Sequence, residues 1–183
     1  MANSNRKLLL DEKGIRRAVT RMAHELVERV GSVEDLALIG IHRRGVDIAN
    51  WLSTEVGRAE GITPPTGSLD ITLYRDDLMA IGPLPIVGET RLPKDGIEGK
   101  VVAIVDDVLF TGRTVRAALD ELTDFGRPRR ILLCVLVDRG GRELPIHADV
   151  VGKRIAVDGQ DRVEVLVPEV DGELAITLVR AGT

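Results

Sequence analysis

The stretch KVVAIVDDVLFTGRTVRAAL, Lys100 to Leu119, decides the fold. An apolar run, 101–105, ends in two adjacent aspartates, Asp106 and Asp107, and a short turn leads into a segment with helical spacing. A buried strand, a tight turn and a helix in this order form one unit of an α/β protein with a mostly parallel sheet. Ligands of such sheets bind at the carboxyl ends of the strands, so we expect a binding site at this turn.

The turn after the aspartates suits a phosphate group. Thr111, Gly112, Arg113 and Thr114 stand at the start of the predicted helix, where backbone N–H groups and the helix dipole attract anions. The aspartates repel a phosphate, so they require another part of the same ligand, either hydroxyl donors or a metal ion. A ribose with free vicinal hydroxyls and a 5′-phosphate meets both requirements.

Two other classes of nucleotide-binding motif and one structural role compete for this stretch. A Walker B strand also ends in acids, but it needs the pattern G-x-x-x-x-G-K-[ST] elsewhere, and the nearest stretch, GIHRRGV at 40–46, lacks the last two residues. No G-x-G-x-x-G is present, so the fingerprint of dinucleotide binding is missing. A purely structural interpretation is that the aspartate pair caps a turn.

Two further predicted strands also end in charged residues. The strand at 36–41 runs into a basic turn, and arginine forks bind phosphate oxygens bidentately, although a solvated basic turn is the alternative. Two anion sites around a carboxylate pair suggest a sugar with phosphates at two ends. The strand that ends at Val137 leads into a turn that we expect to border the same crevice. The residues concerned are His42, Arg43, Arg44 and Gly45 in the first turn, and Asp138 and Arg139 in the second.

The remaining pattern predicts one α/β domain over all 183 residues. Hydrophobic periodicity predicts helices and strands along the whole chain, and a segment rich in proline and glycine predicts a long surface loop or β-hairpin arm. The predicted helices are 12–30, 45–57 and 113–125; the strands are 36–41, 68–74, 101–105, 129–138, 149–155, 162–167 and 174–179; the arm is 75–99.

Composition excludes several classes of protein. The formal net charge of −4 argues against a global basic field, and the 2% aromatic content argues against base stacking as the main mode of RNA contact. The single cysteine, Cys134, excludes an internal disulfide or a cysteine-rich metal site. No apolar run has the length of a signal peptide or a membrane span, so we expect a cytoplasmic protein without membrane contact.

The motif VVAIVDDVLFTGRT resembles the 5-phosphoribosyl-1-pyrophosphate (PRPP) binding motif of type I phosphoribosyltransferases. Within that family, the chain resembles the pyrimidine operon attenuation proteins that are also uracil phosphoribosyltransferases. The resemblance covers roughly 12–153 and implies the type I phosphoribosyltransferase fold, with a flexible arm at 75–99 and a small hood at 149–180. The segments that carry it are IRRAVTRMAHELVER (15–29), DITLYRDDL (70–78), DDVLFTGRTVRAALD (106–120), GRPRRI (126–131) and LVDRGGRELPIHADVVGK (136–153).

The resemblance implies that uracil and PRPP give UMP and pyrophosphate, with Mg²⁺ carried by PRPP near Asp138 and no direct protein ligand. Asp106 and Asp107 would hold the ribose hydroxyls and stabilise positive charge on the ribose, Asp107 would assist as acid or base, and Arg44 would neutralise the leaving pyrophosphate. The segment 153–157 would recognise uracil. The implied PRPP and UMP contacts are Arg43, Arg44, Gly45, Arg75, Val105, Asp106, Asp107, Val108, Leu109, Phe110, Thr111, Gly112, Arg113, Thr114, Asp138 and Arg139.

The resemblance also implies UMP-dependent binding of a stem-loop in pyrimidine operon mRNA, by a homodimer or higher homo-oligomer. From the residues alone, a solvated amphipathic face is the alternative. Two further alternatives are a regulator with little catalysis and a phosphoribosyltransferase for another base. The implied RNA contacts are Arg16, Arg17, Thr20, Arg21 and His24 on the first helix, joined by Arg142 and His147.

The sequence departs from the family pattern at three places. Arg43 stands where the family prefers threonine, and Gly141 stands where histidine is expected. The segment 154–162, RIAVDGQDR, replaces a stretch that resembles Asn-Val-Pro-Thr-Ser. These changes concern the pyrophosphate turn, an RNA-facing turn and the hood, so the PRPP site is the firmest part of the resemblance.

Overall fold

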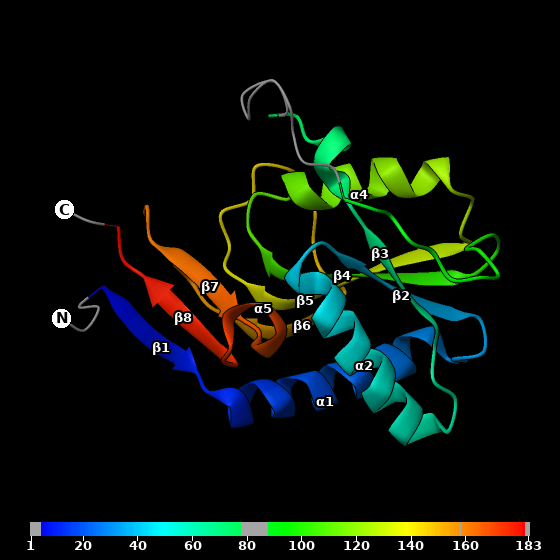
Figure 1. Ribbon diagram of the computed structural model, residues 1–183, viewed down its shortest axis with the longest axis horizontal. Helices are drawn as coiled ribbons and strands as arrows, with labels where there is room; N and C mark the ends of the chain where they lie inside the picture. The colour runs from blue at the N-terminus through cyan, green and yellow to red at the C-terminus, as the bar shows by residue number, and fades with distance from the viewer. Residues whose placement is uncertain (1–4, 78–87, 158, 182–183) are drawn as a thin grey trace.

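The computed structural model describes residues 5–77, 88–157 and 159–181 (Figure 1). Strands and helices alternate through the first two thirds of the chain, as the sequence predicts. The elements in order are β1 (Arg6–Leu10), α1 (Glu12–Val30), β2 (Leu36–Ile41), α2 (Arg44–Glu60), β3 (Thr66–Leu69), the 3₁₀ helix η1 (Ile71–Tyr74), β4 (Val101–Leu109), α4 (Arg113–Asp124), β5 (Arg130–Asp138), β6 (Val150–Arg154), β7 (Arg162–Leu166), α5 (Pro168–Asp171) and β8 (Ala175–Val179).

A five-stranded parallel sheet forms the centre, in the order β3-β2-β4-β5-β6. Its middle strands are apolar along most of their length because helices cover both faces. One core cluster joins the sheet to α1 and α2, and a second joins its other face to α4. The mostly parallel α/β architecture predicted from the sequence is therefore confirmed.

A smaller antiparallel sheet, β1-β8-β7, lies beside the end of the large sheet at which its parallel strands finish (Figure 1). It unites the first described strand with the last two. Its inward residues Val163, Val165 and Ile176 belong to the same core cluster as α1 and α2. This corrects the predicted hood over 149–180, because β6 pairs with β5 in the large sheet and β1 completes the small one.

Two predicted strands were wrong in extent, and two short elements were not predicted. The strand expected over 68–74 ends at Leu69, because the Asp70 side chain accepts the backbone N–H of Thr72 and starts a 3₁₀ turn. The strand expected to end at Val105 continues to Leu109, so Asp106 and Asp107 lie within β4. Sequence analysis missed β1 and α5, which are both short.

The predicted arm over 75–99 lies partly outside the described residues. Its described later part is packed against the body of the protein rather than projecting from it. Arg91 forms an antiparallel bridge with Ser68, and Ile97 is fully buried. Thr90 accepts the backbone N–H of Asp70 and donates to Glu121 of α4. These contacts fix the segment beside β3.

Candidate active site

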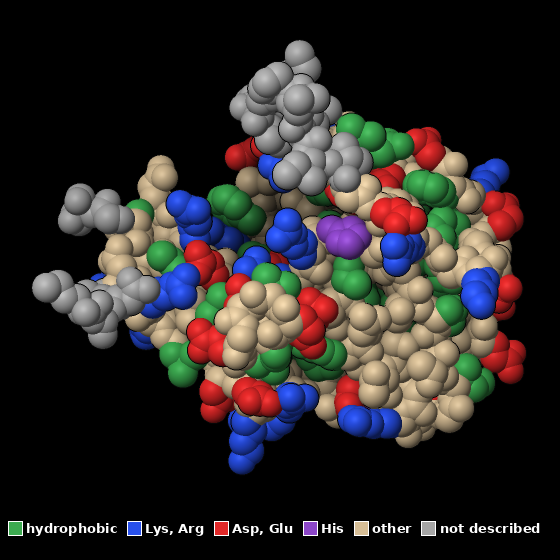
Figure 2. Space-filling view, viewed as in Figure 1, with side chains coloured by type: hydrophobic (Ala, Val, Ile, Leu, Met, Phe, Trp, Pro, Cys, Tyr) green, Lys and Arg blue, Asp and Glu red, His purple; other side chains and the backbone are tan. Residues whose placement is uncertain are grey.

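A crevice opens at the carboxyl ends of β2, β3 and β4. The chain passes from β2 to β3 on one side and then crosses to β4 on the other, so this is the switch point at which α/β sheets bind ligands. The cavity measures about 450 Å³. Lys and Arg side chains gather over this part of the surface beside Asp and Glu side chains (Figure 2). Seven predicted residues line it: Arg43, Arg44, Arg75, Asp106, Asp107, Val108 and Thr114.

The two aspartates enter the cavity from β4 in different environments. Asp106 is only 6% exposed, whereas Asp107 is half-buried. The Asp106 carboxylate accepts the backbone N–H of Asp107 at 2.9 Å, and the Asp107 carboxylate accepts that of Val108 at 2.8 Å. Burial, and then the charge of Asp107, raise the pKa of Asp106 well above its ordinary value. The pair therefore concentrates negative charge that has no arginine partner of its own among the described ion pairs.

We expect Asp106→Asn to stabilise the fold while impairing the site. The pKa of Asp106 is raised in the folded state, so its ionisation costs stability; this cost appears as the pH rises above the ordinary carboxyl pKa and is complete above the folded-state pKa. Asparagine keeps an oxygen for the Asp107 N–H and removes the buried charge. Thermal unfolding should show a gain on the order of 1 kcal/mol at neutral pH. The gain should vanish below the ordinary carboxyl pKa; a gain that persists in acid would contradict this account.

The turn after β4 forms a second hollow of about 220 Å³, which adjoins the first at Ile71, Arg75 and Thr114. Thr111 and Arg113 also line it. Gly112 opens α4 with a φ of +94°, a conformation that favours glycine. The start of α4 and the two threonines, Thr111 and Thr114, therefore line one small cavity, as an anion site at a helix N-terminus requires.

The guanidinium of Arg113 is already engaged on both sides. It donates to Glu143 at 2.7 Å and forms an ion pair with Asp76. The turn is also fixed to the loop after β5, because the carbonyl of Thr111 accepts hydrogen bonds from the backbone N–H groups of Glu143 and Leu144. Backbone N–H groups and hydroxyls are consequently the donors best placed for a phosphate here.

The basic turn after β2 approaches β4 closely. Gly45 lies in the first turn of α2, and a Cβ atom there would lie 2.5 Å from the carbonyl oxygen of Val105. Only glycine permits this contact. The approach brings Arg43 and Arg44 to the same cavity as the aspartates, and the His42–Arg43 peptide between them and β2 is cis.

Several predicted site residues point away from the cavity. The side chains of Val105 and Leu109 are buried in the two core clusters, on opposite faces of the sheet. Asp138 binds the guanidinium of Arg142 at 2.6 Å, and Arg142 also donates to the Phe110 carbonyl at 2.8 Å. Burial raises the pKa of Asp138, but the hydrogen bonds from Arg142 and the Gly140 N–H outweigh it, so the pKa is lowered overall.

Phe110 and Arg139 form a stacked pair beside the crevice. The Arg139 guanidinium lies 3.9 Å from the centre of the Phe110 ring, and it donates to the Asp161 carbonyl at 2.8 Å. Arg139 is only 6% exposed and does not line the cavity. The same ring explains a departure from the family pattern: Gly141 has a φ of +76°, and a Cβ atom there would meet Phe110 at 2.4 Å.

The predicted RNA-binding residues of α1 do share one exposed face. Arg16, Arg17, Thr20, Arg21 and His24 together line a shallow hollow. Arg21 also donates to the carbonyls of β6, and Arg16 pairs with Glu12 at 2.7 Å.

The other two predicted RNA contacts do not join this face. Arg142 is tied to Asp138 and the Phe110 carbonyl, so its guanidinium braces the phosphate turn. His147 is exposed, but its neighbours Ile146 and Ala148 pack on the α4 side of the sheet, whereas α1 covers the opposite side. Within one chain, the predicted single basic surface is therefore wrong.

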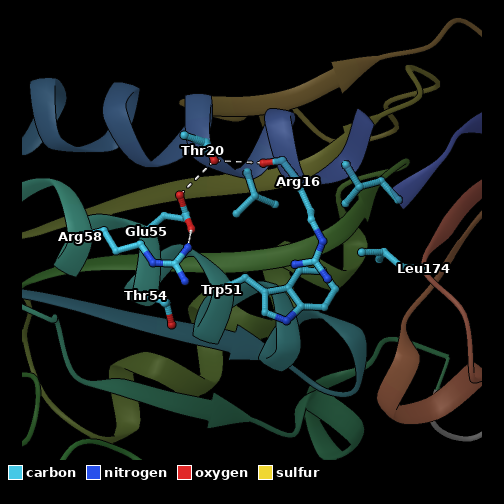
Figure 3. Close-up of a pocket in the computed structure, with 9 residues that line it drawn as sticks. Arg16, Thr20, Trp51, Thr54, Glu55, Arg58 and Leu174 are labelled. Carbon is cyan, nitrogen blue, oxygen red and sulfur yellow. Dashed lines mark hydrogen bonds and ion pairs between the residues drawn. The ribbon is translucent and has the colours of Figure 1, made fainter. Parts of the chain in front are cut away.

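A groove between α1 and α2 adjoins the α1 face (Figure 3). It measures about 420 Å³ and contains Trp51, the chain's single tryptophan. Thr20 donates to Glu55 at 3.0 Å across it, and Glu55 pairs with Arg58. These contacts join the two helices at some distance from the aspartates.

His42 of the predicted basic turn also lines the cavity. Two residues that sequence analysis did not assign to the site lie in or beside it: Asp70 lines it, and Asp171 of α5 binds Arg44. Asp70 follows a strand end just as Asp106 does, so its position in the sheet was a usable signal. No sequence pattern marks Asp171, because its partner Arg44 lies 127 residues earlier in the chain.

The described residues hold no group of three or more His, Cys, Asp or Glu side chains arranged for a metal ion. Mg²⁺ usually keeps several waters and takes one or two protein carboxylates together with substrate phosphates. Asp106 and Asp107 supply two carboxylates in the crevice, as that mode of Mg²⁺ binding requires. Nor does any helix in the described segments combine the length and apolarity needed to cross a bilayer.

The fold and the crevice define a phosphoribosyl transferase. The sequence pattern of the family described as "Phosphoribosyl transferase domain" matches residues 5–170. Solved structures share the fold: a hypoxanthine phosphoribosyltransferase from Trypanosoma cruzi, in a ternary substrates complex, has a TM-score of 0.73 at 22% identity, covering 95% of each chain. One from Staphylococcus aureus has a TM-score of 0.69 at 21% identity, covering 95% of this chain and 92% of that one.

Curated relatives narrow the family. The "Bifunctional protein PyrR" of Roseiflexus sp. (strain RS-1) is 55% identical over 166 residues, 91% of this chain and 90% of the relative. That of Thermus aquaticus is 55% identical over 93% of both chains, and that of Clostridioides difficile is 52% identical over 93% of this chain and 96% of the relative. The chain belongs to the family of bifunctional PyrR proteins.

Proposed function

We propose that the protein is a uracil phosphoribosyltransferase that also regulates pyrimidine biosynthesis genes by UMP-dependent binding of their mRNA. One observation carries the enzymatic part. A carboxylate pair, a phosphate-type helix start and a basic turn converge on one crevice at the switch point of the sheet. These three features match the ribose hydroxyls, the 5′-phosphate and the pyrophosphate of PRPP.

In the proposed reaction, the bond between ribose C1 and the pyrophosphate oxygen breaks, and a bond from C1 to uracil N1 forms. Uracil loses its N1 proton, and pyrophosphate leaves. Positive charge develops on the ribose ring, and the carboxylates of Asp106 and Asp107 stabilise it electrostatically. Arg44 faces the negative charge on the leaving group, and Asp107, the more exposed carboxylate, is the better placed of the two to exchange a proton.

Mg²⁺ enters this account as a companion of PRPP. Asp106 and Asp107 would hold it, in place of the predicted position near Asp138 without a direct protein ligand, because Arg142 already binds Asp138. When bound, it would neutralise charge on the leaving pyrophosphate. Arg75 and the arm after it would exclude water from the reacting PRPP. Residues 153–157, Asp138 and Arg139 do not line the cavity. Recognition of uracil by 153–157 and substrate contacts of Asp138 and Arg139 therefore stay predictions.

A panel of bases tests the enzymatic proposal. The protein, PRPP and Mg²⁺ are incubated with uracil, orotate, hypoxanthine or guanine, and nucleotide formation is followed. We expect UMP from uracil and no product from the other three. Turnover of a purine would assign the protein to a different substrate, and PRPP binding without any turnover would favour a regulator with little catalysis.

The RNA-binding part of the proposal is supported by the α1 face. Three arginines, a threonine and a histidine lie together there on a chain whose overall charge is negative. A local cluster of this kind supplies phosphate contacts whose strength falls with salt. We place the protein in the cytoplasm with its transcript, as a homodimer or higher oligomer that sets two such faces side by side.

We expect Arg17→Ala to weaken UMP-dependent binding of the operon stem-loop roughly tenfold. Arg17 is exposed, and loss of one phosphate contact should also reduce the slope of log affinity against log salt by about one. Arg127→Ala is the matched control, because Arg127 is an exposed arginine in the α4–β5 loop that does not line the α1 hollow. Filter binding over a salt series measures both; equal losses in the two variants would refute the assignment of this face.

A further inference from the structure

We propose that Asp171 is a positioning residue for the leaving pyrophosphate, acting through Arg44. This inference rests on the proposed function, because it assumes that Arg44 meets the pyrophosphate. It adds a residue from α5, the turn of helix that connects β7 and β8 of the small sheet, to a site otherwise built from the large sheet.

The contact between the two side chains is a side-on ion pair. Arg44 Nε donates to Asp171 Oδ2 at 3.1 Å, and Arg44 Nη2 donates to Asp171 Oδ1 at 2.9 Å. Bidentate pairs of this kind fix the plane of the guanidinium as well as its distance. The Asp171 side chain is 18% exposed and that of Arg44 is 35% exposed, so water screens the pair only in part.

Asp171 is itself held in place. Its Oδ2 also accepts the backbone N–H of Val167 at 2.8 Å, and Val167 is fully buried at the end of the small sheet. The carboxylate is therefore tied to the backbone beside the small sheet, whereas Arg44 lies at the first position of α2 in a turn that faces the cavity. The fixed partner orients the arginine, which has many rotamers of its own.

The geometry leaves Arg44 able to bind a second anion. A guanidinium has five N–H donors, and Asp171 uses one on Nε and one on Nη2. Both donors on Nη1 and the second on Nη2 remain, and Arg44 lines the cavity. Asp171 thus holds one edge of the guanidinium and leaves the other for pyrophosphate, which lowers the entropic cost of binding.

A double-mutant cycle tests this inference. PRPP and Mg²⁺-pyrophosphate are titrated calorimetrically into the wild type, Asp171→Asn, Arg44→Ala and the double variant. Asparagine retains an oxygen for the Val167 N–H, so the local fold should survive, and Asp171→Glu provides a conservative variant. Glu173→Gln is the control, since Glu173 is an exposed carboxylate two residues away.

We expect Asp171→Asn to weaken binding of both ligands roughly tenfold, as loss of a charge-assisted hydrogen-bonded pair does. The affinity of UMP, which lacks pyrophosphate, should hardly change. In the Arg44→Ala background the Asp171 substitution should have no further effect, Asp171→Glu should retain part of the affinity, and Glu173→Gln should bind as the wild type does.

Two results would overturn the inference while the proposed function stands. Equal effects of Asp171→Asn with and without Arg44 would show that Asp171 does not act through it. Tighter PRPP binding by Asp171→Asn would show that Asp171 competes with pyrophosphate for Arg44 instead of orienting it. If the wild type binds neither PRPP nor pyrophosphate, the proposed function fails and the inference falls with it.

Discussion

We expect Asp107→Asn to lower kcat for UMP formation by about 10²–10³, the range found when a group that stabilises transition-state charge is removed. Asp107 lines the cavity, and its neighbour Asp106 is buried. Asparagine keeps the acceptor for the Val108 N–H, so the backbone of β4 should hold its shape. Only the negative charge facing the ribose is lost.

Steady-state kinetics with uracil and PRPP measure this effect. Asp95→Asn is the control, because Asp95 is an exposed carboxylate in the loop before β4. We expect the control to match the wild type in kcat and Tm. A kcat for Asp107→Asn within about threefold of the wild type would mean that the aspartate pair does not face the reacting ribose, and the mechanism above would be wrong.

Gly45→Ala should damage both stability and activity. A Cβ atom at this position would lie 2.5 Å from the Val105 carbonyl oxygen and 3.3 Å from the Cα atom of Asp106. Backbone cannot yield as a side-chain end can, so α2 must move away from β4. Overpacking of this kind costs about 1–3 kcal/mol, or roughly 2–12 °C in Tm for a chain of this size.

The same shift separates the basic turn from the aspartates. A displacement of about 1 Å at a reacting site can cost 10²-fold in rate, so activity should fall more than stability alone explains. Gly14→Ala provides the control, because Gly14 also lies in the first turn of a helix, α1, and a Cβ atom there would meet the end of the Leu10 side chain, which can move. Differential scanning calorimetry measures Tm and the UMP assay measures activity for both variants. Equal losses in the two would show that the close contact between α2 and β4 has no special importance.

The parts of the site that could be predicted are those encoded locally. A strand, its terminal aspartates and a glycine-containing turn before a helix are consecutive in sequence, and the crevice follows from the parallel order of β2 and β4. The helices α1, α2 and α4 followed from their hydrophobic period. In each case, neighbours in the sequence determine the structure.

The parts that could not be predicted depend on distant contacts. Asp171 meets Arg44 across 127 residues, and β1 is a strand because β8 pairs with it. Arg142 carries the same charge as the arginines of α1, so sequence alone could not tell that Asp138 and the Phe110 carbonyl bind it. The charge of a residue indicates which kinds of group it can bind, but the fold decides which of those groups lies next to it.

We propose that PRPP, the substrate, and UMP, the regulatory nucleotide, bind to the same crevice, one at a time. Calorimetric titration of UMP into the protein, alone and with saturating Mg²⁺-PRPP, tests it most directly. We predict one UMP per chain in the first titration and none in the second. Undiminished UMP binding in the presence of PRPP would contradict the claim, because it would place the regulatory nucleotide at a different site.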